Sequence, residues 1–205
     1  MIVIIDYGMG NLGSILNRLE RMETEVIISS KAEQIEKADK LILPGVGSFA
    51  AGIDNLKKRD LIGVLEKKII IEKAPILGIC LGMQLFTRRS EEGDAEGLGW
   101  VDAETRKFNF TSEDAKLRIP HMGWNSINKL RDSLLLVDLP DGASFYFVHS
   151  YYVQCNDPGN VVATTRYGID FACVIQKANI FGTQFHPEKS HQDGIVLLRN
   201  FIERI

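Results

Sequence analysis

The 205-residue sequence lacks the features that would direct a chain to a membrane, to nucleic acid or to an oxidising compartment. No apolar run approaches the ~18 residues of a membrane span, and no basic region precedes the apolar start at residues 2–5. The formal net charge of −3 argues against nucleic acid as the main partner. The three cysteines include no C-x-x-C pair, which argues against disulfides and against a zinc or other metal site. We therefore expect a cytoplasmic protein that has no membrane or nucleic-acid partner and no metal.

The chain does carry the composition and patterns of a compact enzyme. Its hydrophobic content of 45% can form a substantial core, and we find no internal repeat or low-complexity segment. Strand and helix patterns alternate in the first half, whereas short strands separated by Gly, Asp, Pro and Asn follow residue 100. These patterns predict a single α/β domain over residues 1–205, with three layers and a mixed central sheet. The active site is expected at the carboxyl edge of the strands.

The expected elements can be given by residue range. Helices are expected over residues 12–22 (with Asn11 as N-cap), 31–37, 60–73, 81–88 and 195–205. Strands are expected over residues 2–5, 26–29, 40–43, 76–79, 103–109, 116–119, 124–128, 145–148, 151–155, 161–166, 171–176 and 180–185, with a polar loop over residues 89–97.

The strongest chemical signal is a buried strand that runs into a cysteine between two glycines. Gly78 and Gly82 stand two residues before and two residues after Cys80, and a helical pattern follows. This spacing is typical of a nucleophile elbow, whose strained strand-to-helix turn leaves no room for flanking Cβ atoms. The helix N-terminus favours the thiolate. The N–H of Leu81, the residue after the nucleophile, can donate a hydrogen bond to an oxyanion. A free cysteine is often a small core residue, but the two glycines favour a nucleophile.

A cysteine nucleophile needs a base and a group that orients the base. The candidates follow an apolar strand pattern that ends in His186-Pro187-Glu188. Positions i and i+2 of an extended chain face the same side, so His186 and Glu188 can converge on one point. Pro187 biases His186 away from helix. We predict Cys80 as nucleophile, His186 as base and Glu188 as the orienting group, since such residues meet in the fold and not in the sequence.

The elbow with a late His-Pro-Glu resembles the class I (triad) glutamine amidotransferases. The narrower resemblance is to the glutaminase subunits of imidazole glycerol phosphate synthases, and it covers nearly the whole chain. It rests on Asp-Tyr-Gly-Met-Gly-Asn-Leu at 6–12, Pro-Gly-Val-Gly-Ser-Phe at 44–49, Pro-His-Met-Gly-Trp-Asn at 120–125, Tyr-Phe-Val-His-Ser-Tyr at 146–151 and His-Pro-Glu-Lys-Ser at 186–190.

The resemblance implies a three-layer fold with a mixed, mostly parallel sheet plus antiparallel strands. It also implies an activity that needs no cofactor: hydrolysis of L-glutamine to glutamate and ammonia. The ammonia would pass to a synthase (cyclase) barrel subunit in a heterodimer, most simply for imidazole glycerol phosphate formation in histidine biosynthesis. By the same resemblance, Val46 N–H is the second oxyanion donor beside Leu81.

The resemblance also assigns binding residues. Gln84 and the backbone of Ser150 and Tyr151 would hold the α-amino and carboxylate groups of glutamine, with Gly47 lining the pocket. The interface with the barrel would include Asn11, Trp124 and Lys189.

Alternatives in other classes stay open on the sequence alone. Cysteine peptidases and hydrolases of related architecture share the elbow but lack the Met-Gln that follows Leu-Gly here. A binding subunit with a dead site would lack the triad, which this sequence has. Amidotransferases of surface-sugar biosynthesis share nearly all the motifs, and residues 100–112 resemble theirs equally. Among the other histidines, His149 is expected to be structural, and His121 and His191 have no sequence partner for catalysis.

Overall fold

The computed structural model describes residues 1–110 and 117–205. The α-helices are α1 (Leu12–Glu20), α2 (Ala32–Glu36), α3 (Phe49–Lys58), α4 (Ile62–Glu66), α5 (Leu81–Leu85) and α6 (His191–Glu203). The strands are β1 (Ile2–Ile5), β2 (Val26–Ser29), β3 (Lys40–Gly45), β4 (Ile76–Cys80), β5 (Arg89–Ser90), β6 (Ala95–Glu96), β7 (Ala103–Lys107), β8 (His121–Ser126), β9 (Asn128–Lys129), β10 (Ser144–His149), β11 (Tyr151–Cys155), β12 (Val161–Tyr167), β13 (Ile169–Lys177) and β14 (Ile180–Thr183).

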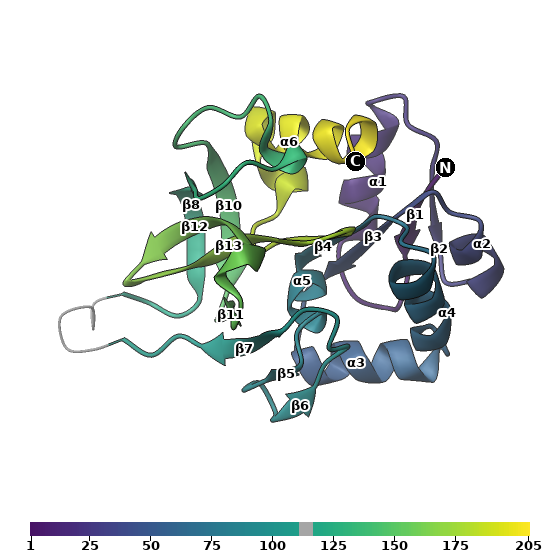
Figure 1. The fold of residues 1–205 in the computed structure, drawn as a ribbon, viewed down its shortest axis with the longest axis horizontal. Helices are drawn as coiled ribbons and strands as arrows, with labels where there is room; N and C mark the ends of the chain where they lie inside the picture. The colour runs from purple at the N-terminus through teal and green to yellow at the C-terminus, as the bar shows by residue number, and fades with distance from the viewer. Residues whose placement is uncertain (111–116) are drawn as a thin grey trace.

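One mixed sheet runs through the described residues and joins twelve of these strands (Figure 1). Its main path is β2-β1-β3-β4-β14-β13-β11-β7-β5-β6, and β12 and β9 pair alongside β13. The strands from β2 to β14 are parallel, and most of the remaining pairs are antiparallel. The carboxyl ends of β3, β4 and β14 therefore lie next to one another, with Gly45 paired to Cys80 and Thr183 to Ile79.

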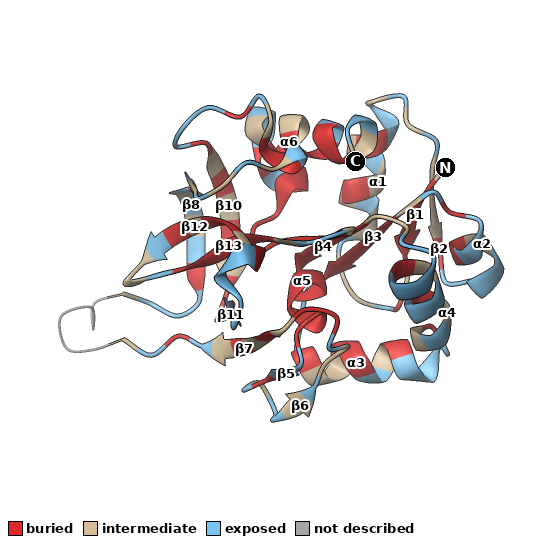
Figure 2. Cartoon of the chain, in the orientation of Figure 1, coloured by how far each residue is buried: buried red, intermediate tan, exposed pale blue. Residues whose placement is uncertain are grey.

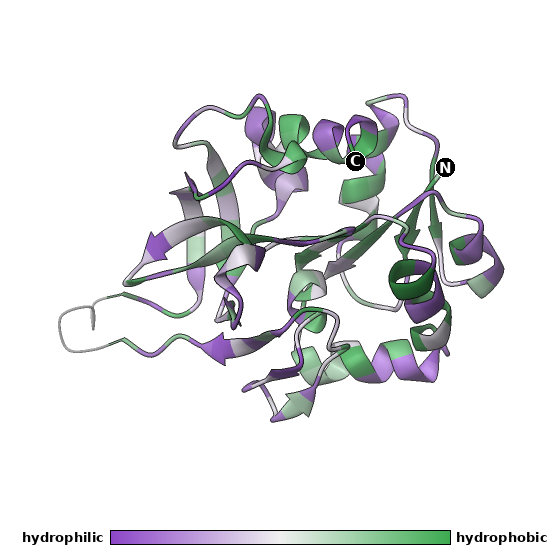
Figure 3. Ribbon diagram, viewed as in Figure 1, coloured by the Kyte–Doolittle hydropathy of each residue, from purple (hydrophilic) through white to green (hydrophobic). Residues whose placement is uncertain are grey.

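Helices cover both faces of the parallel strands, which gives the three layers expected from the sequence (Figure 1). Leu19 of α1 and Phe201 of α6 belong to one buried cluster, whereas Leu56 of α3 and Leu65 of α4 belong to the other. The central strands are buried and apolar, and the outer faces of the helices are exposed and polar (Figures 2 and 3). Within the described residues, none of the helices combines the length and the apolar composition that crossing a membrane requires.

An antiparallel ribbon of β8 and β10 stands beside the main sheet and joins two of the sequence motifs. In its register His149 pairs with His121 and Tyr146 pairs with Trp124. The backbone N–H of His186 donates to the Tyr146 carbonyl at 2.9 Å, so the ribbon is fixed to the segment that follows β14. The ribbon thereby carries the motifs at 120–125 and 146–151 to the carboxyl edge of the sheet.

Several elements differ from their expected ranges. The sequence predicts no helix between residues 43 and 60, but α3 forms at 49–58, where Phe49, Ile53 and Leu56 have helical spacing and are buried. The helix expected over 60–73 is α4 followed by a π-helical turn, Lys67–Ile71. The polar loop expected over 89–97 contains the short pair β5 and β6.

Other boundaries move for reasons that the packing explains. The helix expected over 81–88 ends at Leu85, where the Thr87 hydroxyl donates to the Gln84 carbonyl. The last helix begins at 191 instead of 195, and the Gly194 N–H donates to the Ser190 carbonyl at 2.9 Å in its first turn. Of the strand expected over 116–119, residue 116 lies outside the described residues, and 117–119 form no strand.

Candidate active site

Cys80 has the backbone geometry of a nucleophile elbow. It is the last residue of β4 and adopts φ 55° and ψ −110°, a left-handed conformation that is strained for a residue with a side chain. A Cβ at Gly78 would lie 2.5 Å from the Phe86 ring, and one at Gly82 would lie 1.8 Å from the Leu43 carbonyl oxygen. Neither position can accept a side chain, so the two glycines are required by the turn itself.

His186 and Glu188 are paired as the sequence predicts. The His186 Nδ1 and Glu188 Oε1 atoms are 2.8 Å apart, and both side chains are buried. Burial by itself lowers the pKa of His186, but the neighbouring Cys80 and Glu188 outweigh burial and raise this pKa to about 9. The His186 Nε2 atom has no hydrogen-bond partner among the described residues. This nitrogen is therefore free to exchange a proton with the neighbouring thiol.

The Cys80 sulfur makes two further polar contacts. It lies 3.8 Å from the Val148 carbonyl oxygen and 3.7 Å from the side-chain nitrogen of Gln184. Only 6% of Cys80 is exposed, so little water competes with these groups. The sulfur is thus held between an acceptor, a donor and the imidazole of His186.

A cavity of about 360 Å³ opens in front of Cys80, a size that suits a small ligand. The lining includes every residue for which an oxyanion or glutamine-binding role is predicted: Val46, Gly47, Leu81, Gln84, Ser150 and Tyr151. These residues come from three separate parts of the chain, and the sheet edge and the ribbon bring them together. Their roles stay predictions, but their convergence on Cys80 is a property of the fold.

The same cavity contains residues for which the sequence predicts no role in catalysis or in glutamine binding. Glu92, Pro120, Val148 and His149 also line it. The Glu92 carboxylate accepts a hydrogen bond from the backbone N–H of Phe49 at 2.7 Å, which fixes it at the start of α3. An acidic residue in a polar, glycine-containing segment gives no local signal of such a position.

A chain of hydrogen bonds behind the cavity fixes the tautomers of two buried histidines. The Tyr151 carbonyl can only accept, so His149 donates to it from Nδ1 at 2.8 Å. His149 Nε2 must then accept from Nδ1 of His121 at 2.9 Å, and His121 Nε2 accepts from the Asn125 amide at 3.4 Å. His149 is therefore a structural residue of the cavity wall, and His121 is its partner.

This histidine pair should make the fold acid-sensitive. Burial lowers the pKa of His121 to about 4 and that of His149 to about 3. In the unfolded chain both histidines take up a proton below about pH 6.5, whereas in the folded chain they stay neutral to a lower pH. The pair therefore contributes its full stability above about pH 6.5. It is lost as the pH falls toward 4 and then 3, at about 1.4 kcal/mol for each unit of depressed pKa. Urea midpoints measured across this range should show the loss.

The matched variant replaces both His121 and His149 by phenylalanine, which keeps two rings and removes both titrating groups. Removing both partners of a buried hydrogen bond can be nearly neutral. Its stability should therefore depend less steeply on pH than that of the natural chain. An equal pH dependence in the two proteins would show that other groups control the acid response.

The three predicted interface residues lie in two different settings. Trp124 is 48% exposed, its ring meets that of Tyr146 edge-on at 6.2 Å, and it stacks on His191 at 4.9 Å. Lys189 Nζ is 6.0 Å from the centre of the Tyr146 ring. Trp124 and Lys189 therefore share one aromatic neighbour, whereas the side chain of Asn11 caps α1.

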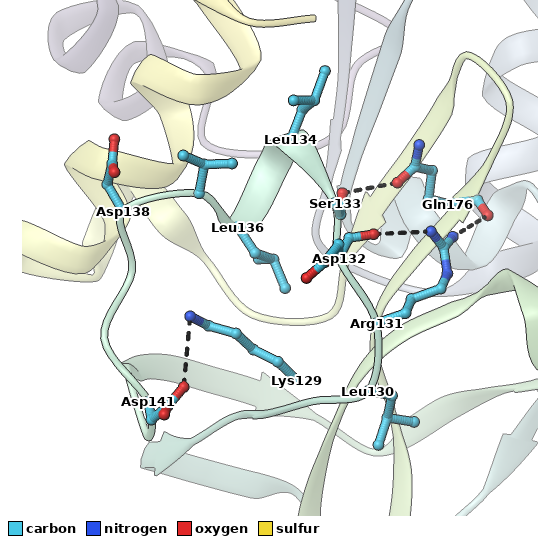
Figure 4. A pocket seen from close by; sticks show the side chains of 11 residues that line it. Lys129, Leu130, Arg131, Asp132, Ser133, Leu134, Leu136, Asp138, Asp141 and Gln176 are labelled. Carbon is cyan, nitrogen blue, oxygen red and sulfur yellow. Dashed lines mark hydrogen bonds and ion pairs between the residues drawn. The ribbon is translucent and has the colours of Figure 1, made fainter.

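A second hollow lies around the 3-10 turn Leu134–Leu136 and contains none of the predicted site residues (Figure 4). The Lys129 ammonium donates to the Leu139 carbonyl, and the Arg131 guanidinium donates to the Gln176 carbonyl. Both cationic side chains, Lys129 and Arg131, are therefore already hydrogen-bonded within the protein. In the part of the chain that the structure describes, no three His, Cys, Asp or Glu side chains gather as a metal site would require.

Comparisons with known proteins show the family of the chain. The family "Glutamine amidotransferase class-I" matches residues 3–205. An imidazole glycerol phosphate synthase subunit HisH 2 of Methanococcus maripaludis is 52% identical over 209 residues and covers 100% of both chains. The subunit HisH of Leptospira borgpetersenii is 45% identical and covers 98% of each.

Solved structures support the fold as well. A crystal structure of a glutamine amidotransferase superimposes with a TM-score of 0.73 at 20% sequence identity, covering 99% of this chain and 98% of the other. At that identity the likeness concerns the fold alone, whereas the family match and the relatives extend over nearly the entire sequence. This chain belongs to the class-I glutamine amidotransferase family, in its group of imidazole glycerol phosphate synthase subunits.

Proposed function

We propose that the chain hydrolyses the side-chain amide of L-glutamine and delivers the ammonia to a synthase (cyclase) barrel subunit. The ammonia serves imidazole glycerol phosphate formation in histidine biosynthesis. The observation that carries the proposal is the strained elbow of Cys80, which faces a small cavity and has the buried His186–Glu188 pair as its neighbour. The names of the full-length relatives supply the pathway.

In the first half of the reaction His186 Nε2 takes the proton of the Cys80 thiol. The thiolate attacks the amide carbon of glutamine, a C–S bond forms, and the carbonyl electron pair moves to oxygen. The N–H groups of Leu81 and Val46 stabilise this oxyanion. Glu188 holds the imidazole and supports its positive charge, in line with the raised pKa of His186.

In the second half the C–N bond breaks, and His186 returns its proton to the leaving ammonia. Water then attacks the thioester with His186 as base, which releases glutamate and restores the thiol.

The hydrogen bonds around Gln84 support its role in binding the α-amino group. Its side-chain nitrogen donates to the Tyr151 carbonyl and to Gln184 Oε1, both at 3.0 Å. These two bonds use both hydrogens of the amide, so Oε1 is left to accept from the ligand. Gln84 lines the cavity, and a substrate ammonium is the group that such an oxygen would bind.

The exposed apolar residues near the cavity suit a protein partner. Ile119 and Met122 are exposed next to Pro120, which lines the cavity, and Trp124 extends the same ribbon. We propose that this surface, with Lys189 and Asn11, contacts the barrel subunit, so that ammonia passes between the subunits without being protonated in water. Cys80, Cys155 and Cys173 are all free thiols, which supports a reducing, cytoplasmic location.

The ammonia acceptor is tested directly. The chain, copurified with the barrel subunit of its own organism, receives glutamine labelled in the amide nitrogen. We expect the label in imidazole glycerol phosphate when the matching ribonucleotide acceptor is supplied. No observation favours a surface-sugar acceptor, and label transfer only to such a sugar would contradict the pathway while leaving the glutaminase intact. Glutamate release from free glutamine likewise separates this function from that of a cysteine peptidase.

A further inference from the structure

We propose that Gln184 is a further catalytic residue, whose side-chain N–H donates to the Cys80 sulfur and stabilises its thiolate. The proposal rests on the glutaminase function proposed above. Gln184 directly follows β14 and has an exposed fraction of 0%. A carboxamide that is fully buried needs partners for its polar atoms, and those partners here are Gln84 and Cys80.

The direction of the Gln184 amide follows from the Tyr151 carbonyl. This carbonyl can only accept, so the Gln84 atom 3.0 Å from it is the NH2 group. The same NH2 group lies 3.0 Å from Gln184, which must present its oxygen there. The other end of the Gln184 amide is then the nitrogen, 3.7 Å from the Cys80 sulfur. The Tyr151 carbonyl thereby fixes the orientation in which the Gln184 N–H points at the Cys80 sulfur.

The two polar contacts of the sulfur have opposite effects on its ionisation. The Val148 carbonyl, 3.8 Å away, accepts only and favours the neutral thiol. The Gln184 N–H favours the thiolate, because a donor stabilises the charged form. Without Gln184, the imidazole of His186 alone would have to oppose the carbonyl. A hydrogen bond to a charged group corresponds to about a 10- to 100-fold change in equilibrium.

Gln184 is also held in place before substrate arrives. Its backbone N–H donates to the Cys173 carbonyl at 2.9 Å, and its side-chain oxygen accepts a hydrogen bond from the Gln84 amide. A donor that needs no reorganisation during the reaction is most effective in a site with little water. A carboxamide also does not titrate, so it supports the thiolate at every pH at which the enzyme works.

The test measures alkylation of Cys80 by iodoacetamide, which reports thiolate without any glutamine. In Gln184→Met, which keeps a long side chain but lacks the donor, we expect alkylation at neutral pH to slow about 10- to 100-fold. The rate should recover at higher pH, where the thiol ionises without help. Burial raises the pKa of Cys155 to about 12 and also raises that of Cys173, so neither thiol competes, and Cys80→Ser serves as the blank.

The titratable groups nearest the sulfur are Tyr7 and His186, with Glu188 beside His186. Glu92, His149 and Tyr151 line the same cavity, and all of these groups are unchanged in the variant. An unchanged pH profile in folded Gln184→Met overturns the proposal, and so does a loss of thermal stability without a shift in that profile. If Gln184→Met does not fold, the alkylation rate is measured in Gln84→Met instead. This variant removes the hydrogen bond that holds the Gln184 side chain but keeps Gln184 itself. Slower alkylation then supports the proposal, and an unchanged rate overturns it. A chain that shows these shifts but hydrolyses no glutamine would refute the proposed function alone.

Discussion

Cys80→Ser should lose glutaminase activity by on the order of 10⁴- to 10⁶-fold, measured as glutamate release with the partner subunit present. The reason is that serine keeps the shape of the side chain but its hydroxyl is a far weaker nucleophile than a thiolate. His186→Ala should lose nearly as much, because the thiol then has no base. Glu188→Gln should lose less, since it keeps a side chain of the same shape beside His186.

The three residues act as a unit, so the losses should not add. A Cys80→Ser/His186→Ala double variant should be hardly slower than either single variant. Cys155→Ser is the matched control, since this half-buried thiol lies outside the cavity and its loss should leave the rate unchanged. Activity within tenfold of the natural chain in Cys80→Ser, with an intact fold, would remove Cys80 from the mechanism.

The isolated chain should hydrolyse glutamine slowly, and the barrel subunit loaded with acceptor should raise the rate about 10²- to 10³-fold, the usual effect of one oxyanion donor. Val46 is 43% exposed and stands between Gly45 and Gly47, and Gly47 has φ +116°. Because its neighbours carry no Cβ, the Val46 peptide can present either its N–H or the preceding carbonyl to the cavity at little steric cost. Partner contacts can then select the orientation that completes the oxyanion site.

Val46→Pro tests whether the N–H of this peptide is the donor, because proline has no N–H to donate. We expect this variant to bind the barrel subunit but to stay at the low rate of the isolated chain, whereas Val46→Ala should still be activated. Steady-state rates of each protein alone, with partner, and with partner plus acceptor make the comparison. Equal rates of the natural chain in all three conditions, or full activation of Val46→Pro, would mean that the Val46 peptide is not the switch.

Local sequence patterns were sufficient for much of the fold. The apolar run ending at Cys80 and the strand before His186 both lie where the sequence predicts them, because burial on both faces requires continuous apolar residues. The predicted Asn11 cap is confirmed, since its side chain accepts from the Ser14 N–H. Helix α3 was missed although its spacing is helical, because it follows a glycine-rich turn and contains Gly52.

What the sequence determined by itself is therefore the chemistry of single segments: an elbow that only glycines permit around Cys80, and a histidine paired with a carboxylate two residues later. The pairing is as predicted, but Pro187–Lys189 form a 3-10 turn and not the extended chain that the sequence led us to expect. These features depend on neighbours within a few residues, and local sterics define them. Only the tertiary structure decided which polar groups meet the nucleophile. Gln184 reaches the sulfur and Gln84 because β14 runs parallel beside β4. Such contacts depend on the path of the whole chain, which no local pattern records.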